Sequence, residues 1–455
     1  MAKPTIQYIC SSCGARAPQM LGRCPVCGEW GTYEEEVVES RKPKDRSSQS
    51  PSTTRPQRLQ EVEASEEMRI DMRNGEFNRV LGGGLVPGSL VLLGGEPGIG
   101  KSTLALQVLM QQGERKTFYA SGEESVRQLK LRAERLAGNA ENLFISSETS
   151  LEHILEQVRQ VEPEIVVIDS IQTIGTEEVE ASIGSLTQVR ECASRILEFA
   201  KTRNIPFIII GHINKEGSLA GPKVLEHIVD TVLQFEGDQQ YMYRILRAQK
   251  NRFGSTSEIG IYEMRQDGLR EVTNPSELLL STAREGLSGI AIAAAVEGVR
   301  PFLIEVQALV SSAAYGTPQR SSTGFDGRRL NMLLAVLEKR VGFKLLQKDV
   351  FLNIAGGLRV QDPAIDLAVL AAVLSSNMDI PLDAGTCICG EVGLAGEIRP
   401  VNRLEQRIAE AQKLGFRRIL VPAEQMDRIA HKTQNAIETV PVRKVTDAFR
   451  LLIKS

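Results

Sequence analysis

Short, uninterrupted runs of apolar residues recur through the middle of the chain, at 90–93, 165–168 and 207–210. Runs of this length without polar alternation are typical of strands that are buried on both faces of a parallel sheet. Between these runs the apolar residues follow the period of a helix, at 103–112, 124–137, 151–160 and 185–203. This alternation predicts an α/β domain with a mainly parallel sheet, which we place at residues 61–275.

A second α/β region is predicted at residues 285–455, where the helical patterns lie at 327–341, 363–376 and 402–414. The first domain is preceded by residues 34–60, which begin with three glutamates and continue with basic residues among serine, threonine, glutamine and proline. Such a composition cannot bury enough apolar surface to fold alone, so we expect a flexible linker. Residues 1–33, which hold four cysteines and the only tryptophan, form a separate small unit.

Composition and charge narrow the class of protein. The 455 residues are 42% hydrophobic and 24% charged, which is ordinary for a globular protein of several domains. The formal net charge of −3 excludes binding to nucleic acid or membrane through overall charge, so any such binding needs a local basic surface. The chain lacks a run of about 18 uncharged apolar residues and an apolar leader at its N-terminus, so we expect no membrane span and a cytoplasmic location.

The N-terminal unit contains two Cys-x-x-Cys pairs that are separated by ten residues: Cys10, Cys13, Cys24 and Cys27. Two such pairs can place four thiolates tetrahedrally around one Zn²⁺. Because four protein ligands leave no open position on the metal, the predicted zinc site is structural. The odd total of seven cysteines fits a reducing compartment and a metal site better than a disulfide framework.

A glycine-rich segment follows the strand at 90–93 and reads Gly-Glu-Pro-Gly-Ile-Gly-Lys-Ser, which matches G-x-x-x-x-G-K-[ST]. Glycines let backbone N–H groups surround phosphates, and the N-terminus of the following helix adds its dipole. We expect Lys101 to reach the β- and γ-phosphates of ATP and Ser102 to hold Mg²⁺. The predicted nucleotide-binding residues are Gly95, Glu96, Pro97, Gly98, Ile99, Gly100, Lys101, Ser102 and Thr103.

Polar residues follow three of the predicted strands. Asp169 ends the strand at 165–168, where a carboxylate can hold Mg²⁺, although it can also serve only as a strand-end cap. A strand at 116–120 is followed by Glu123 and Glu124, and we prefer Glu123 as the group that polarises the attacking water. Both glutamates are alternatively solvated acids at a helix start. His212 is placed to sense the γ-phosphate or is an ordinary strand-end histidine.

In this order along the chain, the features resemble the bacterial RadA family of DNA-repair proteins, also called Sms, over essentially the full length. The segment Lys250-Asn251-Arg252-Phe253-Gly254 matches the family's own signature. The resemblance implies a RecA-like ATPase core and a hexameric ring that binds single-stranded and branched DNA. It also implies ATP-driven branch migration of recombination intermediates alongside RecA, and hence a role in homologous recombination and DNA repair.

The signature segment lies at the end of a predicted strand at 243–248. In ring ATPases a cation from one subunit can stabilise transition-state charge in its neighbour's site, and DnaB-type helicases are similar here. We therefore expect Lys250 and Arg252 to act catalytically in trans, with a DNA contact or a solvated basic loop as the alternatives.

DNA contacts are expected from loops that face the central channel of a ring, at 175–186 and 214–223. Lys215 and Lys223 in the second loop suit contacts with phosphates. Neither loop contains an aromatic residue for stacking, and the first is acidic. The sequence thus favours backbone contact without base reading, and the alternative for 214–223 is a plain surface loop.

Residues 390–401 closely match the domain of Lon proteases, which use a serine nucleophile activated by a lysine. The Lon serine position holds Ala364 here, and the lysine position holds Glu405. We therefore expect no peptidase activity and a role in oligomerisation. Two functions stay open: a helicase-like, DNA-dependent ATPase, or a scaffold for RecA that uses ATP as a switch. Six basic residues can form a duplex-DNA surface or a solvated helix face: Arg328, Arg329, Lys339, Arg340, Lys344 and Lys348.

Overall fold

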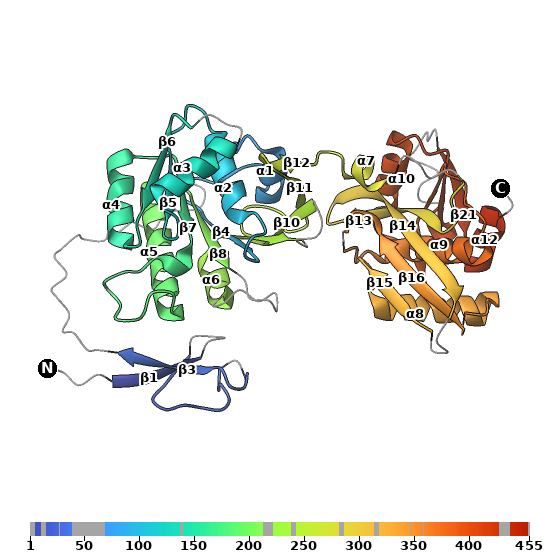
Figure 1. Cartoon of the computed structure of the whole chain (residues 1–455), viewed down its shortest axis with the longest axis horizontal. Helices are drawn as coiled ribbons and strands as arrows, with labels where there is room; N and C mark the ends of the chain where they lie inside the picture. The colour runs from blue at the N-terminus through green and yellow to red at the C-terminus, as the bar shows by residue number, and fades with distance from the viewer. Residues whose placement is uncertain are drawn as a thin grey trace, which may run out of the picture. The chain divides into compact units, whose positions relative to one another are not determined.

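The computed structural model describes residues 5–10, 15–26, 28–38, 69–136, 140–212, 222–237, 243–281, 286–313, 318–345, 347–357, 359–426 and 437–453. The chain divides into two compact units, whose elements are labelled in Figure 1. The division falls between Glu271 and Val272, except that Gly237–Tyr243 and Ser257–Ile261 belong to the second unit. None of the helices in the described ranges is long and apolar enough to cross a membrane.

The N-terminal residues form a small antiparallel sheet in the order β2-β1-β3, with β1 (Thr5–Cys10), β2 (Arg16–Ala17) and β3 (Tyr33–Val38). The expected linker at 34–60 is wrong at its start, because residues 34–38 belong to β3. Their backbone pairs with residues 5–9 of β1, so strand pairing overrides the polar composition of this segment. Residues 39–60 lie outside the described residues.

The first unit is built on a nine-stranded sheet in the order β12-β11-β10-β9-β4-β8-β7-β5-β6. The six strands from β9 to β6 in this order are parallel, while β10 is antiparallel to β9 and β11 is antiparallel to β12. The strands are β4 (Leu90–Gly95), β5 (Thr117–Ser121), β6 (Leu143–Ser147), β7 (Ile165–Asp169), β8 (Phe207–His212), β9 (Thr231–Glu236), β10 (Tyr243–Asn251), β11 (Ile259–Arg265) and β12 (Gly268–Glu271).

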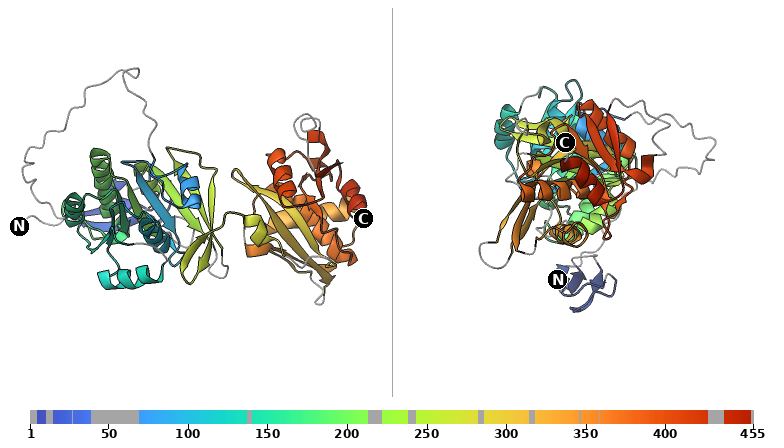
Figure 2. Two further views of the ribbon diagram at one scale, coloured as in Figure 1. Left: turned by 90° about the horizontal axis from the view of Figure 1, so that it is seen from above. Right: turned by 90° about the vertical axis from the view of Figure 1, so that its right-hand side faces the viewer.

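Helices cover both faces of this sheet (Figure 2), which explains the uninterrupted apolar runs of its strands. One core joins the sheet to α1, α2 and α3, and the other joins it to α4, α5 and α6. Ser125, Ser150 and Ser185 begin α3, α4 and α5, because each hydroxyl accepts a hydrogen bond from a free N–H of the first turn. The helices are α1 (Gly75–Leu81), α2 (Lys101–Met110), α3 (Val126–Arg135), α4 (Leu151–Val161), α5 (Leu186–Arg203) and α6 (Pro222–Ile228).

The second unit contains a mixed seven-stranded sheet in the order β15-β16-β14-β13-β17-β20-β21. Its strands are β13 (Ile290–Glu297), β14 (Arg300–Ser312), β15 (Arg320–Thr323), β16 (Lys348–Ile354), β17 (Thr386–Ile388), β20 (Arg418–Pro422) and β21 (Glu438–Val442). The helices are α7 (Pro275–Leu279), α8 (Gly327–Val336), α9 (Asp366–Met378), α10 (Leu404–Lys413) and α12 (Val445–Ile453). Residues 366–375 of α9 are all buried, so this helix forms the centre of the core.

Candidate functional site

A glycine-rich loop joins the end of β4 to the start of α2. Gly98 and Gly100 have φ angles of 76° and 113°, which favour glycine over residues with a side chain. A Cβ atom at Gly100 would lie 2.8 Å from Cε of Met264, a flexible side-chain end that can shift, so the positive φ angle is the stronger reason for glycine here. Ile99 is 1% exposed and anchors the loop in the core. The loop therefore has the backbone conformation that the motif predicts.

The tip of this loop and the first turn of α2 differ in exposure. Glu96 and Pro97 are exposed at the tip, whereas Ser102 and Thr103 are half-buried in the first turn of the helix. The first N–H groups of a helix have no partners within the helix and attract anions. This end of α2 is thus open to a phosphate group.

Lys101 begins α2 and is only 3% exposed. Its Nζ donates hydrogen bonds to the carbonyl oxygens of Gly95, at 2.7 Å, and Glu96, at 2.9 Å. Burial lowers the pKa of Lys101 to about 8, although the negative charges of Asp169 and Glu123 oppose this shift. The ammonium group is therefore held close to the loop and to the two acidic residues.

Asp169 is the last residue of β7 and is 5% exposed. Its Oδ2 accepts a hydrogen bond of 2.6 Å from the hydroxyl of Tyr119, a fully buried residue of β5. Burial, together with the nearby negative charge of Asp169, raises the pKa of Tyr119 well above its usual value. Tyr119 therefore remains a hydrogen-bond donor. The sequence analysis missed this residue, although its position two residues before the end of β5 is visible in the sequence.

Glu123 lies in the loop after β5 and meets Ser170, which follows β7, and His212, the last residue of β8. Its Oε1 accepts a hydrogen bond of 2.6 Å from the hydroxyl of Ser170 and lies 3.2 Å from Nε2 of His212. Since an ionised carboxylate only accepts, the His212 nitrogen in this contact carries the proton. Burial acts to raise the pKa of Glu123, but the contacts with Ser170 and His212 outweigh it and lower the pKa overall. Glu123 is thus a carboxylate at neutral pH.

Glu124 has different neighbours. Its carboxylate forms an ion pair with Arg132 of α3, and its backbone N–H donates to the hydroxyl of Ser121 at 2.9 Å. Glu123, unlike Glu124, is among the acids whose charge acts on Lys101. The structure therefore brings Lys101, Asp169 and Glu123 together at one end of the parallel strands.

Lys250 and Arg252 lie at the other end of these strands. Lys250 pairs with the beginning of β9, and β9 runs parallel to β4, whose far end leads into the glycine-rich loop. Nζ of Lys250 donates to the carbonyl of Glu226 in α6, at 2.6 Å, and to that of Val229 just after this helix, at 2.7 Å. Arg252 contacts Asp230 at 3.4 Å, and its side chain is 54% exposed. The structure does not bring these cations to the glycine-rich loop of their own chain.

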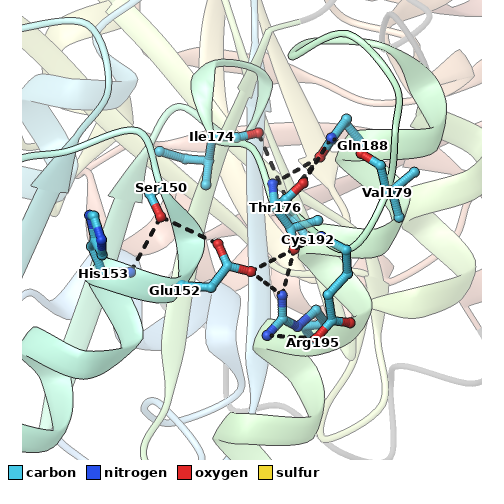
Figure 3. A network of polar contacts seen from close by, with 10 residues as sticks. Ser150, Glu152, His153, Ile174, Thr176, Val179, Gln188, Cys192 and Arg195 are labelled. Carbon is cyan, nitrogen blue, oxygen red and sulfur yellow. Dashed lines mark hydrogen bonds and ion pairs between the residues drawn. The ribbon is translucent and has the colours of Figure 1, made fainter. Parts of the chain in front are cut away.

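The structure describes the two predicted DNA-binding loops to different extents. Lys215 lies outside the described residues, and Lys223 falls in α6 with a side chain that is not described. The loop at 175–186 is held firmly by Gln188 of α5, whose amide nitrogen donates to three loop carbonyls (Figure 3): those of Thr176, Val179 and Ala181. The hydroxyl of Thr176 also meets Glu152 of α4 and Arg195 of α5.

The cysteine-containing segment before the nine-stranded sheet, residues 5–38, contains two similar turns. The N–H of Cys10 donates to the carbonyl of Ala15, and the N–H of Cys24 donates to that of Glu29, both at 2.9 Å. Both cysteines are fully buried. Cys13 and Cys27 lie outside the described residues. The matched turns fit two zinc knuckles, in which backbone turns direct thiolates toward one metal ion.

Two residues of the second unit, Ala364 and Glu405, are aligned with the Lon dyad in the sequence analysis. Ala364 is completely buried just before α9, and Glu405 is exposed on α10. Between α10 and the segment before α9, Arg407 forms an ion pair of 2.6 Å with Asp362 and is 2% exposed. Of the six basic residues, Arg329 donates from Nε and Nη2 to the two carboxylate oxygens of Asp366, so this side chain is already used inside the domain.

The strand order, the glycine-rich loop and Asp169 define a RecA-like P-loop ATPase, here combined with a zinc ribbon and a Lon-like C-terminal domain. Family models match at residues 53–218 (AAA domain), 325–425 (subunit ChlI of Mg-chelatase) and 8–35 (rubredoxin metal binding domain). DNA repair protein RadA of Bacillus subtilis strain 168 is 49% identical over 455 residues, covering 99% of each chain. That of Halalkalibacterium halodurans is 44% identical over 457 residues, covering 100% of each. The chain belongs to the family of DNA repair protein RadA, and it is an ATPase of this family.

Two solved structures also align with the chain. A KaiC-like protein from Pyrococcus horikoshii OT3 has a TM-score of 0.38 and 20% identity, covering 45% of this chain and 98% of that protein. The RadB recombinase has a TM-score of 0.36 and 21% identity, covering 44% of this chain and 99% of that protein.

Proposed function

We propose that the protein is a DNA-dependent, helicase-like ATPase that binds single-stranded and branched DNA and promotes branch migration in recombination. The observation that carries this proposal is the meeting of Lys101, Asp169 and Glu123 beside the glycine-rich loop. Phosphoryl transfer needs a cation on the phosphates, a carboxylate for Mg²⁺ and a group that orients water, and these three residues supply them.

The roles follow from where each side chain lies. Lys101 exchanges its contacts with loop carbonyls for the β- and γ-phosphates of ATP, while Ser102 and Asp169 hold Mg²⁺. The metal supplies positive charge that neutralises the phosphate oxygens. Glu123, which is ionised at neutral pH, accepts a hydrogen bond from the attacking water and so orients it.

Lys250 and Arg252 complete the site of a neighbouring subunit in a homo-hexameric ring. They are separated from their own P-loop by the length of β4, whose six residues span about 17 Å. This distance exceeds the length of an arginine side chain, which favours action in trans. The exposed Arg252 is the freer of the two cations.

DNA is bound by the segment at 214–223, through Lys215 and through Lys223 in the first turn of α6. The loop at 175–186 is a poorer candidate, because its backbone is held by Gln188 and its side chains are acidic. Phosphate contacts need mobile cations rather than fixed carboxylates.

The remaining parts of the proposal concern the N-terminal ribbon, the C-terminal domain, the protein partner and the location in the cell. The four cysteines of the ribbon hold one structural Zn²⁺. The C-terminal domain supports oligomerisation without peptidase activity, because Ala364 offers no nucleophile. RecA is the partner in recombination, and the protein acts in the cytoplasm.

The decisive experiment measures ATP hydrolysis by the full-length protein with and without single-stranded DNA, beside Lys101→Ala. DNA-stimulated hydrolysis that is lost in the variant, together with migration of branched DNA, is the expected result. Binding of ATP without DNA-stimulated hydrolysis would replace the motor with a scaffold that uses ATP as a switch.

A further inference from the structure

We infer that Tyr119 is a positioning residue that orients the carboxylate of Asp169 for Mg²⁺; this inference rests on the proposed role of Asp169 in the ATPase site. The hydroxyl of Tyr119 lies 2.6 Å from Oδ2 of Asp169. The two residues are 50 positions apart in the sequence, and they lie on neighbouring parallel strands.

The register of β5 and β7 explains how the two side chains meet. Tyr119 pairs with Val167, and Ser121 pairs with Asp169. Since side chains alternate along a strand, Asp169 points to the same face of the sheet as Val167 and Tyr119. A diagonal neighbour on one face lies within reach of a long aromatic side chain. The phenol ring therefore bridges the two positions and brings its hydroxyl to the end of β7.

Burial makes this hydrogen bond difficult to replace. Tyr119 is 0% exposed and Asp169 is 5% exposed, so water has little access to the bonded oxygen. Among the described residues, we find no side-chain donor to the other oxygen, Oδ1. The hydroxyl thus fixes the rotation of the carboxylate through Oδ2 and leaves Oδ1 for the metal or for a water bound to it.

Hydrogen bonds that orient a metal ligand contribute to metal affinity without touching the metal. Loss of such a partner commonly weakens metal binding or activity by about 10- to 100-fold. For Tyr119→Phe, which keeps the ring and removes only the hydroxyl, we expect the lower end of this range. About tenfold more Mg²⁺ should be needed for half-maximal effect.

The chain provides a matched control in Tyr262. This tyrosine is also 0% exposed in the same core, and its hydroxyl donates to Oδ1 of Asn74 at 2.8 Å. Tyr262→Phe removes a buried hydroxyl of comparable geometry without touching Asp169. A general loss of packing or stability would affect both variants, whereas a positioning role affects Tyr119→Phe alone.

The experiment titrates Mg²⁺ against the full-length protein and follows two readouts: binding of a fluorescent ATP analogue, and ATP hydrolysis. We expect both titrations to shift about tenfold in Tyr119→Phe and to remain at the wild-type position in Tyr262→Phe. Nucleotide binding in excess chelator should be unchanged in both variants. The inference is overturned if Tyr119→Phe needs the same Mg²⁺ concentration as the wild type, or if the two variants shift equally.

The variant Asp169→Asn distinguishes a failure of this inference from a failure of the role proposed for Asp169. If Asp169→Asn leaves the Mg²⁺ dependence unchanged, the assigned role of Asp169 is wrong and the inference falls with it. If Asp169→Asn shifts the titration and Tyr119→Phe does not, only the inference fails. In the Asp169→Asn background, Tyr119→Phe should add no further shift, because the oriented carboxylate is already absent.

Discussion

Lys101 brings a positive charge into the protein interior, and the lowered pKa of this group should make the stability of the nucleotide-free protein, relative to a variant without the charge, depend on pH. The perturbation is Lys101→Met, which keeps an unbranched side chain of similar length and removes the ammonium group. The variant also loses the two hydrogen bonds to the carbonyls of Gly95 and Glu96. The net effect depends on the balance between the burial of the charge and these hydrogen bonds.

The pKa of Lys101 sets the size of the charge term. A folded-state pKa of about 8, against the usual 10.5, corresponds to a cost of about 3 kcal/mol near pH 7, at roughly 1.4 kcal/mol per pKa unit. The two hydrogen bonds, which a charged group donates, return about 1.5–3 kcal/mol each. Near pH 7 they therefore offset the cost of the buried charge, and the variant should be no more stable than the wild type.

The difference in stability between wild type and variant should change with pH, in favour of the wild type as the pH rises. Because the pKa of Lys101 is lower in the folded protein, the unfolded chain binds more protons between pH 8 and pH 10.5, and wild-type stability from this group rises with pH there. Near pH 10 the cost falls to about 1 kcal/mol, so Lys101→Met is the less stable protein there.

Urea unfolding followed by far-ultraviolet circular dichroism, at several pH values and without nucleotide, measures the difference between variant and wild type. Other titrating groups largely cancel in this difference. A difference that stays constant from pH 7 to pH 10 would refute the reasoning, since it would mean that Lys101 is not held in the interior as a costly cation.

Three further predictions follow from the site and from the second unit. Glu123→Gln should bind ATP and hydrolyse it at least about 100-fold more slowly, while Glu124→Gln retains hydrolysis; steady-state rates with the roles reversed would assign the base to Glu124. Arg252→Ala and Lys101→Ala should each be inactive alone, but their mixture should regain hydrolysis, because an intact P-loop then meets an intact Arg252 from its neighbour. A mixture as inactive as its components would exclude action in trans. Arg407→Ala leaves a buried carboxylate unpaired and should destabilise the second unit by about 3–5 kcal/mol in urea unfolding. A loss under about 1 kcal/mol would contradict this.

The sequence predicts most of the fold because its signals are local. The runs at 165–168 and 207–210 are strands, and both lie beneath helices on each face of the sheet. The glycine-rich loop and Asp169 are likewise readable, since each depends on contiguous residues next to a strand. The helix expected at 327–341 is α8 up to Val336, and it then continues as a π-helix to Val341.

Other features depend on which segments become neighbours, and this information is absent from any single stretch of sequence. The contact of Tyr119 with Asp169 requires the register between β5 and β7. The polar sequence of β3 conceals a strand whose backbone pairs with β1. Lys250 and Arg252 are both basic, yet only the fold reveals that the ammonium group of Lys250 binds two carbonyls at the end of α6.

The separation of Arg252 from its own P-loop has a geometric consequence for assembly. If Arg252 serves an adjacent subunit, each chain presents two different surfaces, and chains can only join head to tail. Head-to-tail contacts close into a ring or continue as an open filament. A closed ring has as many complete catalytic sites as subunits, whereas an open arc has one fewer and leaves an unassisted P-loop at one end. Closure of the ring would then complete the last catalytic site.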